Sequence, residues 1–158
     1  MPPPIPIYLA GRAKAALERI GRLADGWLGF FVTPKGFQRS SVAIDEARER
    51  AGRIGQPFER GLLLHFLLDD SRAAIAKAQE LNFGFPAELK LAANEDQLKQ
   101  LVLVGSSDEV LARLEQFIEM GCTTFCVSPI EKETEAYRRQ IERFAAEVLP
   151  RLKTGTIR

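Results

Sequence analysis

The turn Ala10-Gly11-Arg12-Ala13 combines features that suit the binding of an anion such as a phosphate. It follows a short apolar run and precedes a segment with helical periodicity, so it lies at a helix N-terminus, where free N–H groups and the helix dipole attract anions. Gly11 lacks a Cβ, which lets a ligand approach the backbone, and Arg12 adds a guanidinium that matches phosphate geometry. A glycine that only permits a tight strand-to-helix turn is the alternative interpretation.

Three further side chains lie in or directly after an apolar run and could handle protons. His65 is the only histidine and belongs to the run GLLLHFLL, residues 61–68. An imidazole there could act as a general acid or base, while a structural histidine with its hydrogen bonds satisfied is the alternative. Asp69 and Asp70 follow this run, and we expect them to cap the next helix.

Two other groups of polar side chains have structural interpretations. Arg48, Arg50 and Arg53 fall within one helical segment, and we expect a solvated face rather than a phosphate site. Cys122 and Cys126 are the only cysteines, four residues apart with no histidine nearby. Small buried thiols are expected, with a metal pair or a disulfide as the alternatives. The sequence contains no GxSxG, HExxH or P-loop motif.

The elements that must position these residues alternate between strands and helices. Apolar runs predict strands at residues 5–9, 27–32, 61–68 and 123–128. Helical periodicity predicts helices at residues 13–24, 34–53 and 132–149, with others after Ser71 and after Glu109. Thr33-Pro34 is expected to be an N-cap with proline in the first turn, and Ser106 to Glu109 a capping box. Within residues 82–104, NFGFP is turn-like, and residues 88–101 are expected to hold one or two short helices.

Strands that are apolar along their whole length and alternate with helices are typical of a parallel sheet covered on both sides, or of a barrel wall. The expected fold class is therefore α/β, with parallel β/α units. Four such units in sequential order correspond to half of a TIM (β/α)8 barrel, and we expect one partial barrel domain over residues 1–158. Ligands of such barrels bind at the carboxyl ends of the strands, where the turns at 10–13, 33–36, 69–71 and 128–129 would meet.

Size, composition and charge fit a globular domain and exclude some classes of partner. The chain has 158 residues, of which 46% are hydrophobic and 27% charged, and its net charge is +1. This balance gives no general attraction to nucleic acids or anionic membranes. No apolar run approaches the ~20 residues of a membrane-spanning helix, and the first residues do not resemble a secretory signal. We therefore expect a cytoplasmic protein with no nucleic-acid or membrane partner.

Several segments resemble the luciferase-like monooxygenases, which are flavin- or deazaflavin-dependent (β/α)8 oxidoreductases. They are PIYLAG followed by a helix and LADGWLGFF, then LLLHFLLDDSRAAIAKA, LVGSSDEVLARLEQFIEMGCTTFCVSP, and a last helix ending in VLPRLK. These segments occur in the family's order over nearly the whole chain, and they resemble its fifth to eighth barrel strands. The family's first four strands have no counterpart in this sequence.

The resemblance implies a function, a cofactor and site residues. The turn Ala10-Gly11-Arg12-Ala13 would contribute to binding FMN or a deazaflavin coenzyme. Thr33 and Lys35 lie near a place where some deazaflavin-dependent members hold a substrate phosphate, although a helix cap and a solvated lysine are the alternative. The expected function is flavin- or deazaflavin-dependent oxidoreduction of the monooxygenase class on a small molecule, with the cofactor carrying the reaction. A non-catalytic flavin-binding or assembly subunit is the alternative function.

A half-barrel would expose its apolar inner face and two unpaired strand edges. Leu9, Phe30 or Phe31, and Phe125 or Val127 are expected on that inner face. We therefore expect the chain to form a homodimer or to bind a partner chain that supplies the other half of the barrel.

Overall fold

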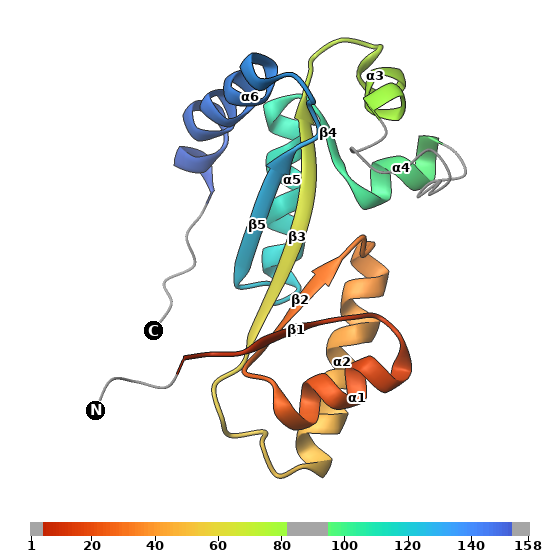
Figure 1. Cartoon of the computed structure of the whole chain (residues 1–158), viewed down its shortest axis with the longest axis vertical. Coiled ribbons are helices and arrows are strands. Elements are labelled where there is room, and N and C mark those ends of the chain that lie inside the picture. Colours follow the sequence, from red (N-terminus) through yellow and green to blue (C-terminus); the bar gives the residue numbers. More distant parts are fainter. Residues whose placement is uncertain (1–4, 82–94, 153–158) are drawn as a thin grey trace. The chain divides into compact units, whose positions relative to one another are not determined.

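The computed structural model describes residues 5–81 and 95–152, and the chain divides into two compact units (Figure 1). Unit 1 comprises Met1–Leu63 and Met120–Cys126, and unit 2 comprises Leu64–Glu119 and Val127–Arg158. The strands β3 (Glu59–Leu68) and β5 (Thr124–Pro129) therefore contribute residues to both units.

Unit 1 contains two complete β/α units besides its share of β3 and β5. Its own elements are β1 (Tyr8–Ala10), α1 (Lys14–Leu23), β2 (Gly26–Phe30) and α2 (Pro34–Arg50). β1 pairs in parallel with β2, with Tyr8 opposite Gly26, and β2 pairs in parallel with β3, with Gly26 opposite Glu59. The element order and the parallel strands confirm the predicted α/β class.

Unit 2 adds a strand that the sequence does not predict. Its elements are α3 (Ala74–Leu81), α4 (Glu95–Leu101), β4 (Leu103–Gly105), α5 (Ser107–Glu119), α6 (Thr134–Glu147) and the short 3-10 helix η2 (Leu149–Arg151). β4 pairs in parallel with the end of β3, with Leu103 opposite Phe66. A three-residue strand is too short to show a period, so only helices were expected between residues 82 and 104. α4 confirms one of them, and residues 82–94 lie outside the described residues.

The pairing register gives the sheet of unit 1 two different faces. Leu9 is paired with Trp27 and lies on the same side of the sheet, whereas Tyr8 and Phe30 point to the opposite side. Trp27 is fully buried and stacks on Phe37 of α2, so the helices cover its side. Tyr8 is exposed and Phe30 half-buried, so the other side is open. The expected inner-face position of Leu9 is therefore wrong, and that of Phe30 is correct.

The helices α1 and α2 lie side by side in unit 1 (Figure 1). A glycine permits their close contact, because a Cβ on Gly21 would come within 2.5 Å of the Ala47 Cβ and 2.7 Å of the Ile44 carbonyl oxygen. Ile20 and Ile44 are both buried at this contact. Leu17, Ile20 and Gly21 of α1 are thus buried, whereas Leu23, which helical periodicity places on the same apolar stripe, is 63% exposed.

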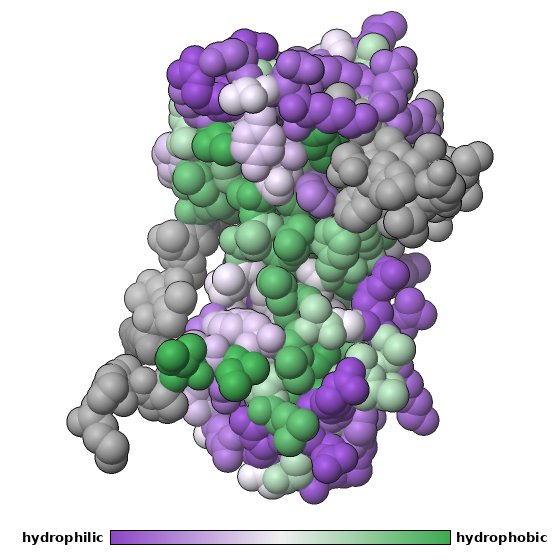
Figure 2. Space-filling model, viewed as in Figure 1, coloured by the Kyte–Doolittle hydropathy of each residue, from purple (hydrophilic) through white to green (hydrophobic). Residues whose placement is uncertain are grey.

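The core of unit 2 joins β3 to α6 and buries one stripe of α5. Phe66 of β3 contacts Phe144 of α6, with ring centroids 4.7 Å apart. The buried residues of α5 include Val110, Leu114 and Phe117. On α6, by contrast, the apolar side chains of Tyr137 and Ile141 are 36% and 47% exposed. Figure 2 shows hydrophobic side chains over β3 and β5 and a mostly hydrophilic surface on α6 in this view.

Replacing Phe37 with alanine is expected to lower the free energy of unfolding by about 3–5 kcal/mol, because the change leaves a cavity beside Trp27. Urea unfolding followed by the fluorescence of Trp27, the only tryptophan, measures this loss. Val42 lies on the same helix and is 54% exposed, so Val42→Ala is the matched control and should change stability by less than about 0.5 kcal/mol. Equal stabilities for the two variants would contradict the packing of Phe37.

Candidate functional site

The turn between β1 and α1 has a backbone that favours glycine. Gly11 has a φ of +142°, in the region that residues with a Cβ rarely adopt. A Cβ at this position would also lie 2.6 Å from the Cβ of Ala16. Gly11 is therefore required by the turn itself, independently of any ligand, and a valine there would test the fold rather than binding.

Two hydrogen bonds connect this turn to β2 and to the residue that follows it. The indole Nε1–H of Trp27 donates to the Gly11 carbonyl oxygen at 3.0 Å. Nη1 of Arg12 donates to the Phe31 carbonyl oxygen at 2.6 Å. Phe31 has a φ of +48°, a left-handed conformation that is uncommon for residues other than glycine. Strained residues of this kind persist only where neighbours hold them, and they concentrate at functional sites.

The N-terminus of α1 is basic and has no side-chain cap. Ala13 occupies the N-cap position without a side-chain hydrogen bond, and the first turn contains no acidic residue. Arg12 and Lys14 flank this position, and both are exposed. A cation at the positive end of a helix dipole is unfavourable by about 0.3–1 kcal/mol. An anion bound here would relieve that repulsion and pair with the two cations.

The second turn, after β2, adds another cation. Oγ1 of Thr33 accepts a hydrogen bond from the N–H of Gly36 at 3.1 Å and caps α2, with Pro34 in the first turn, as predicted. The first turn of α2 also lacks an acidic residue, and the exposed Lys35 lies in it. The bond from Arg12 to the Phe31 carbonyl oxygen links the first turn to the end of β2. The predicted residues 10–13, Thr33 and Lys35 thus follow the carboxyl ends of two neighbouring parallel strands.

Two helix N-termini in unit 2, those of α5 and α6, carry acidic residues instead, whereas the first turn of α3 has none. The predicted capping box of α5 is confirmed, because the Ser106 N–H donates to Oε2 of Glu109 at 2.8 Å and the Glu109 N–H donates to Oγ of Ser106 at 3.3 Å. Asp108 lies in the same turn, and Glu135 in the first turn of α6. These ends are compensated by the chain's own carboxylates, unlike those of α1 and α2.

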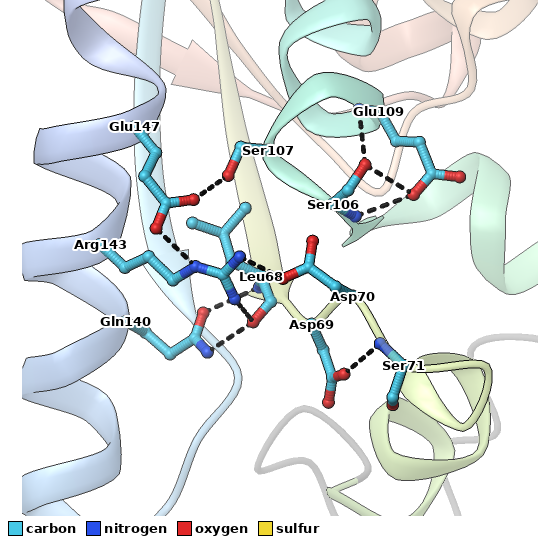
Figure 3. Close-up of polar contacts among 10 residues, drawn as sticks. All are labelled: Leu68, Asp69, Asp70, Ser71, Ser106, Ser107, Glu109, Gln140, Arg143 and Glu147. Carbon is cyan, nitrogen blue, oxygen red and sulfur yellow. Dashed lines mark hydrogen bonds and ion pairs between the residues drawn. The ribbon is translucent and has the colours of Figure 1, made fainter.

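A polar network closes the carboxyl end of β3 in unit 2 (Figure 3). Gln140 of α6 pairs with both backbone groups of Leu68, accepting from its N–H at 2.8 Å and donating to its carbonyl oxygen at 3.0 Å. Arg143 donates to the same carbonyl oxygen at 3.0 Å, to Asp70 at 2.5 Å and to Glu147 at 2.8 Å. The guanidinium of Arg143 is therefore engaged on all three nitrogens by the protein itself.

The carboxylates of this region have structural partners. Hydrogen bonds from Arg143 and from Ser107 lower the pKa of Glu147. Hydrogen bonding with Ser71 lowers the pKa of Asp69, whose Oδ1 accepts from the Ser71 N–H at 2.8 Å. The expected capping role of Asp69 and Asp70 needs correction: Asp69 fixes a turn before α3 begins, and Asp70 pairs with Arg143.

His65 lies in unit 2 on β3 and is half-buried. Burial lowers its pKa, and a hydrogen bond with the backbone of Ser128 acts in the opposite direction. The imidazole is therefore mostly neutral at pH 7. His65 is flanked by the buried Leu64 and Phe66, so it points to the side of the strand opposite to them.

Arg48 contradicts the expectation of a solvated arginine face. It is only 2% exposed, and its guanidinium lies 4.3 Å from the ring centroid of Phe58. Its Nη2 donates to the carbonyl oxygens of Arg53 at 2.9 Å and Gln56 at 2.6 Å. Arg50, by contrast, is exposed and pairs with Glu18, as a surface residue would.

Trp27 and Phe31 contribute to the turn, although the sequence does not indicate that they do. The sequence places both in an apolar run, where an aromatic residue signals only a strand. One signal could have indicated the role of Trp27. A buried indole needs an acceptor for its N–H, and the apolar side chains of the strand cannot provide one, so a backbone carbonyl must do so.

The part of the chain that the structure describes contains neither a metal-binding cluster nor a membrane-spanning helix. Within residues 5–81 and 95–152, no group of three or more His, Cys, Asp or Glu side chains is arranged to hold a metal ion. Among the helices of these same residues, none has both the length and the apolar character that a bilayer-spanning segment needs.

Comparison with known proteins agrees with the resemblance drawn from the sequence. The model of the luciferase-like monooxygenase family matches residues 1–124. The chain is 27% identical to sulfoquinovose monooxygenase of Agrobacterium fabrum, over 96% of this chain and 47% of that protein. It is 24% identical to 5,10-methylenetetrahydromethanopterin reductase of Methanopyrus kandleri, over 94% of this chain and 51% of that protein.

Solved structures share the fold. The coenzyme F420 dependent tetrahydromethanopterin reductase from Methanopyrus kandleri aligns with a TM-score of 0.69 and 21% identity, over 94% of this chain and 51% of that chain. An F420-dependent secondary alcohol dehydrogenase, in complex with an F420-acetone adduct, aligns with a TM-score of 0.76 and 17% identity. The alignment covers 93% of this chain and 49% of that chain. The chain thus spans about half the length of the curated relatives it matches, which agrees with the predicted likeness to half of a (β/α)8 barrel.

The two cysteines are expected to react at very different rates with a thiol reagent. Both are free, but Cys122 is buried, and burial raises its pKa to about 12, so almost no thiolate forms at pH 8. Cys126 is exposed, which contradicts the expected buried thiol. Ellman's reagent at pH 8 should modify one thiol rapidly in the native protein and none rapidly in Cys126→Ser. Two rapid thiols, or a rapid thiol that survives this substitution, would contradict the structure.

Proposed function

Because the chain belongs to the luciferase-like monooxygenase family, we propose that it takes part in flavin- or deazaflavin-dependent oxidoreduction and that its Gly11 turn holds the phosphate of the cofactor. The observation that carries this proposal is the uncompensated positive charge at the carboxyl ends of β1 and β2. Arg12, Lys14 and Lys35 are exposed at helix N-termini that lack acidic residues in their first turns. FMN and phosphate-bearing deazaflavins supply the complementary anion.

The residues of the turn fit such a group without rearrangement of the fold. Nη1 of Arg12 donates to the Phe31 carbonyl oxygen, and this bond fixes the guanidinium. The Arg12 side chain is exposed, so its other nitrogens can donate to a ligand. Charge-assisted hydrogen bonds from a fixed guanidinium to phosphate are short and about twice as strong as neutral ones. The N-terminal N–H groups of α1 add donors with the favourable sign of the helix dipole. Lys35 and the hydroxyl hydrogen of Thr33 are proposed to bind a phosphate of the cofactor or substrate.

The proposed division of work gives the redox step to the cofactor. When bound, a flavin or deazaflavin supplies the chemistry by accepting or donating a hydride, or in the flavin case by reacting with dioxygen. This chain binds and orients it at the ends of β1 and β2. His65 is the candidate for proton transfer, since a neutral imidazole can accept a proton at pH 7. FMN and deazaflavin are both proposed, because the relatives include monooxygenases and F420-dependent enzymes.

One observation favours the alternative proposal of a non-catalytic cofactor-binding or assembly subunit. The chain spans about half the length of the relatives it matches, and the carboxyl ends of β3 and β4 bind their own protein groups. A complete flavin pocket would therefore need side chains or backbone groups from another chain or from residues outside this one. A subunit that binds cofactor but shows no turnover without a partner would match this alternative.

A second copy of the chain is the partner we propose. Within the described residues β1 pairs only with β2, so its other edge is unpaired. Ile7 and Tyr8 are 60% and 37% exposed on this strand and at its start, and no charged residue lies between Ile5 and Ala10. Natural edge strands that remain unpaired usually carry charges, so this edge is suited to association.

Arg12→Ala is expected to weaken FMN or deazaflavin binding about tenfold or more, because it removes charge-assisted hydrogen bonds to the phosphate. Titration followed by the fluorescence of the cofactor measures the dissociation constant. Arg22→Ala removes the same charge from the other end of α1 and is the matched control, which should bind like the wild type. If the wild type binds neither cofactor, or if both variants lose affinity equally, the proposed phosphate site is wrong.

Light scattering coupled to size exclusion tests the proposed self-association. The wild type should elute at twice the monomer mass, and Ile7→Lys should elute as a monomer, because a lysine on the edge of β1 opposes pairing. Ile141 is 47% exposed and lies on α6 of unit 2, outside the strands, so Ile141→Lys is the control and should stay dimeric. A monomeric wild type, or an Ile7→Lys variant that remains dimeric, would contradict association through this edge.

A further inference from the structure

Trp27 combines complete burial with one specific polar contact. Its ring is 0% exposed and stacks on Phe37 with centroids 5.4 Å apart and an interplanar angle of 24°. The indole N–H requires an acceptor in this apolar setting, and it finds the Gly11 carbonyl oxygen at 3.0 Å. A rigid side chain in the core thus reaches the backbone of the turn that precedes α1.

The geometry of the peptide bond extends this contact by one residue. In a trans peptide, the carbonyl of one residue and the N–H of the next point in opposite directions. The described residues contain no cis peptide bond, so the C=O of Gly11 and the N–H of Arg12 are opposed. The carbonyl is directed to the buried indole, and the Arg12 N–H is therefore directed away from it.

This arrangement has an electrostatic consequence for the turn. A carbonyl oxygen directed at a bound anion would repel it, whereas an N–H would attract it. With φ at +142°, Gly11 occupies a backbone region from which a glycine can move easily. Ala13, at the N-cap position of α1, makes no side-chain hydrogen bond that could hold this peptide. The indole bond is the contact that selects one orientation of the Gly11–Arg12 peptide.

Resting on the proposed function, we propose that Trp27 is a positioning residue: its indole N–H holds the Gly11 carbonyl on the core side so that the Arg12 N–H faces the phosphate of the cofactor. Trp27 does not touch the ligand in this account. It determines selectivity for a phosphorylated cofactor, because it acts on the part of the site that recognises the phosphate and leaves the flavin ring unaffected.

The test compares Trp27→Phe with Phe37→Leu. Trp27→Phe keeps an aromatic ring against Phe37 and removes only the donor, whereas Phe37→Leu disturbs the same ring contact and keeps the donor. Two quantities are measured: the ratio of FMN affinity to riboflavin affinity, from flavin fluorescence, and the three-bond HN–Hα coupling of Arg12 without ligand, which reports the φ of Arg12 and so the orientation of the Gly11–Arg12 peptide. Urea unfolding followed by circular dichroism confirms that both variants are folded. The deazaflavin with and without its phosphate replaces the flavin pair if the protein prefers it.

Trp27→Phe should lower FMN affinity about tenfold, as expected for the loss of one hydrogen bond that orients the turn, and should change riboflavin affinity by less than about twofold. Its Arg12 HN–Hα coupling should differ from that of the wild type, because the Gly11–Arg12 peptide is no longer held in one orientation. Phe37→Leu should keep the wild-type affinity ratio and coupling. A wild-type ratio and coupling in Trp27→Phe would overturn the positioning role. If the wild type binds no flavin or deazaflavin, the proposed function fails, and the coupling alone still decides whether Trp27 orients the turn.

Discussion

The hydrogen bond from the Trp27 indole to the Gly11 carbonyl oxygen connects the packing of unit 1 to its candidate site. On one side it depends on the helix-covered face of β2, where Trp27 stacks on Phe37. On the other side it orients the turn that leads into α1. A second bond, from Arg12 to the Phe31 carbonyl oxygen, joins this turn to the next one. The basic residues of the site thus depend on contacts that no single element provides.

The two units differ in the charge and hydrogen bonding of the groups at the carboxyl ends of their strands. In unit 2, Gln140 and Arg143 satisfy the end of β3, and carboxylates occupy the first turns of α5 and α6. These carboxylates are themselves paired, Asp108 with Arg151 and Glu135 with Arg138. In unit 1, the first turns of α1 and α2 have cations and no acidic residues. This contrast is why the proposed anion site lies in unit 1, while the polar network of unit 2 connects α6 to the end of β3.

Much of the fold can be predicted from the sequence because it depends on local patterns. Long apolar runs predict β2 and β3, and signals such as Thr33-Pro34 and the Ser106–Glu109 box predict helix starts that the structure confirms. β4 cannot be predicted in this way, since three residues show no period and their pairing with β3 is a long-range contact. The same reason applies to Asp70, which finds Arg143 seventy-three residues away, and to Arg48, whose burial depends on Phe58. The turn at Gly11 was recognisable, but its bond to Trp27 required the structure.

A crystal structure with FMN or a phosphate-bearing deazaflavin bound tests the central claim most directly. The account predicts that the phosphate lies within hydrogen-bonding distance of the Arg12 guanidinium and of N–H groups at the start of α1, with the Gly11 carbonyl still on the indole of Trp27. A phosphate bound instead at the ends of β3 or β4, beside Asp69 or Ser106, would contradict it.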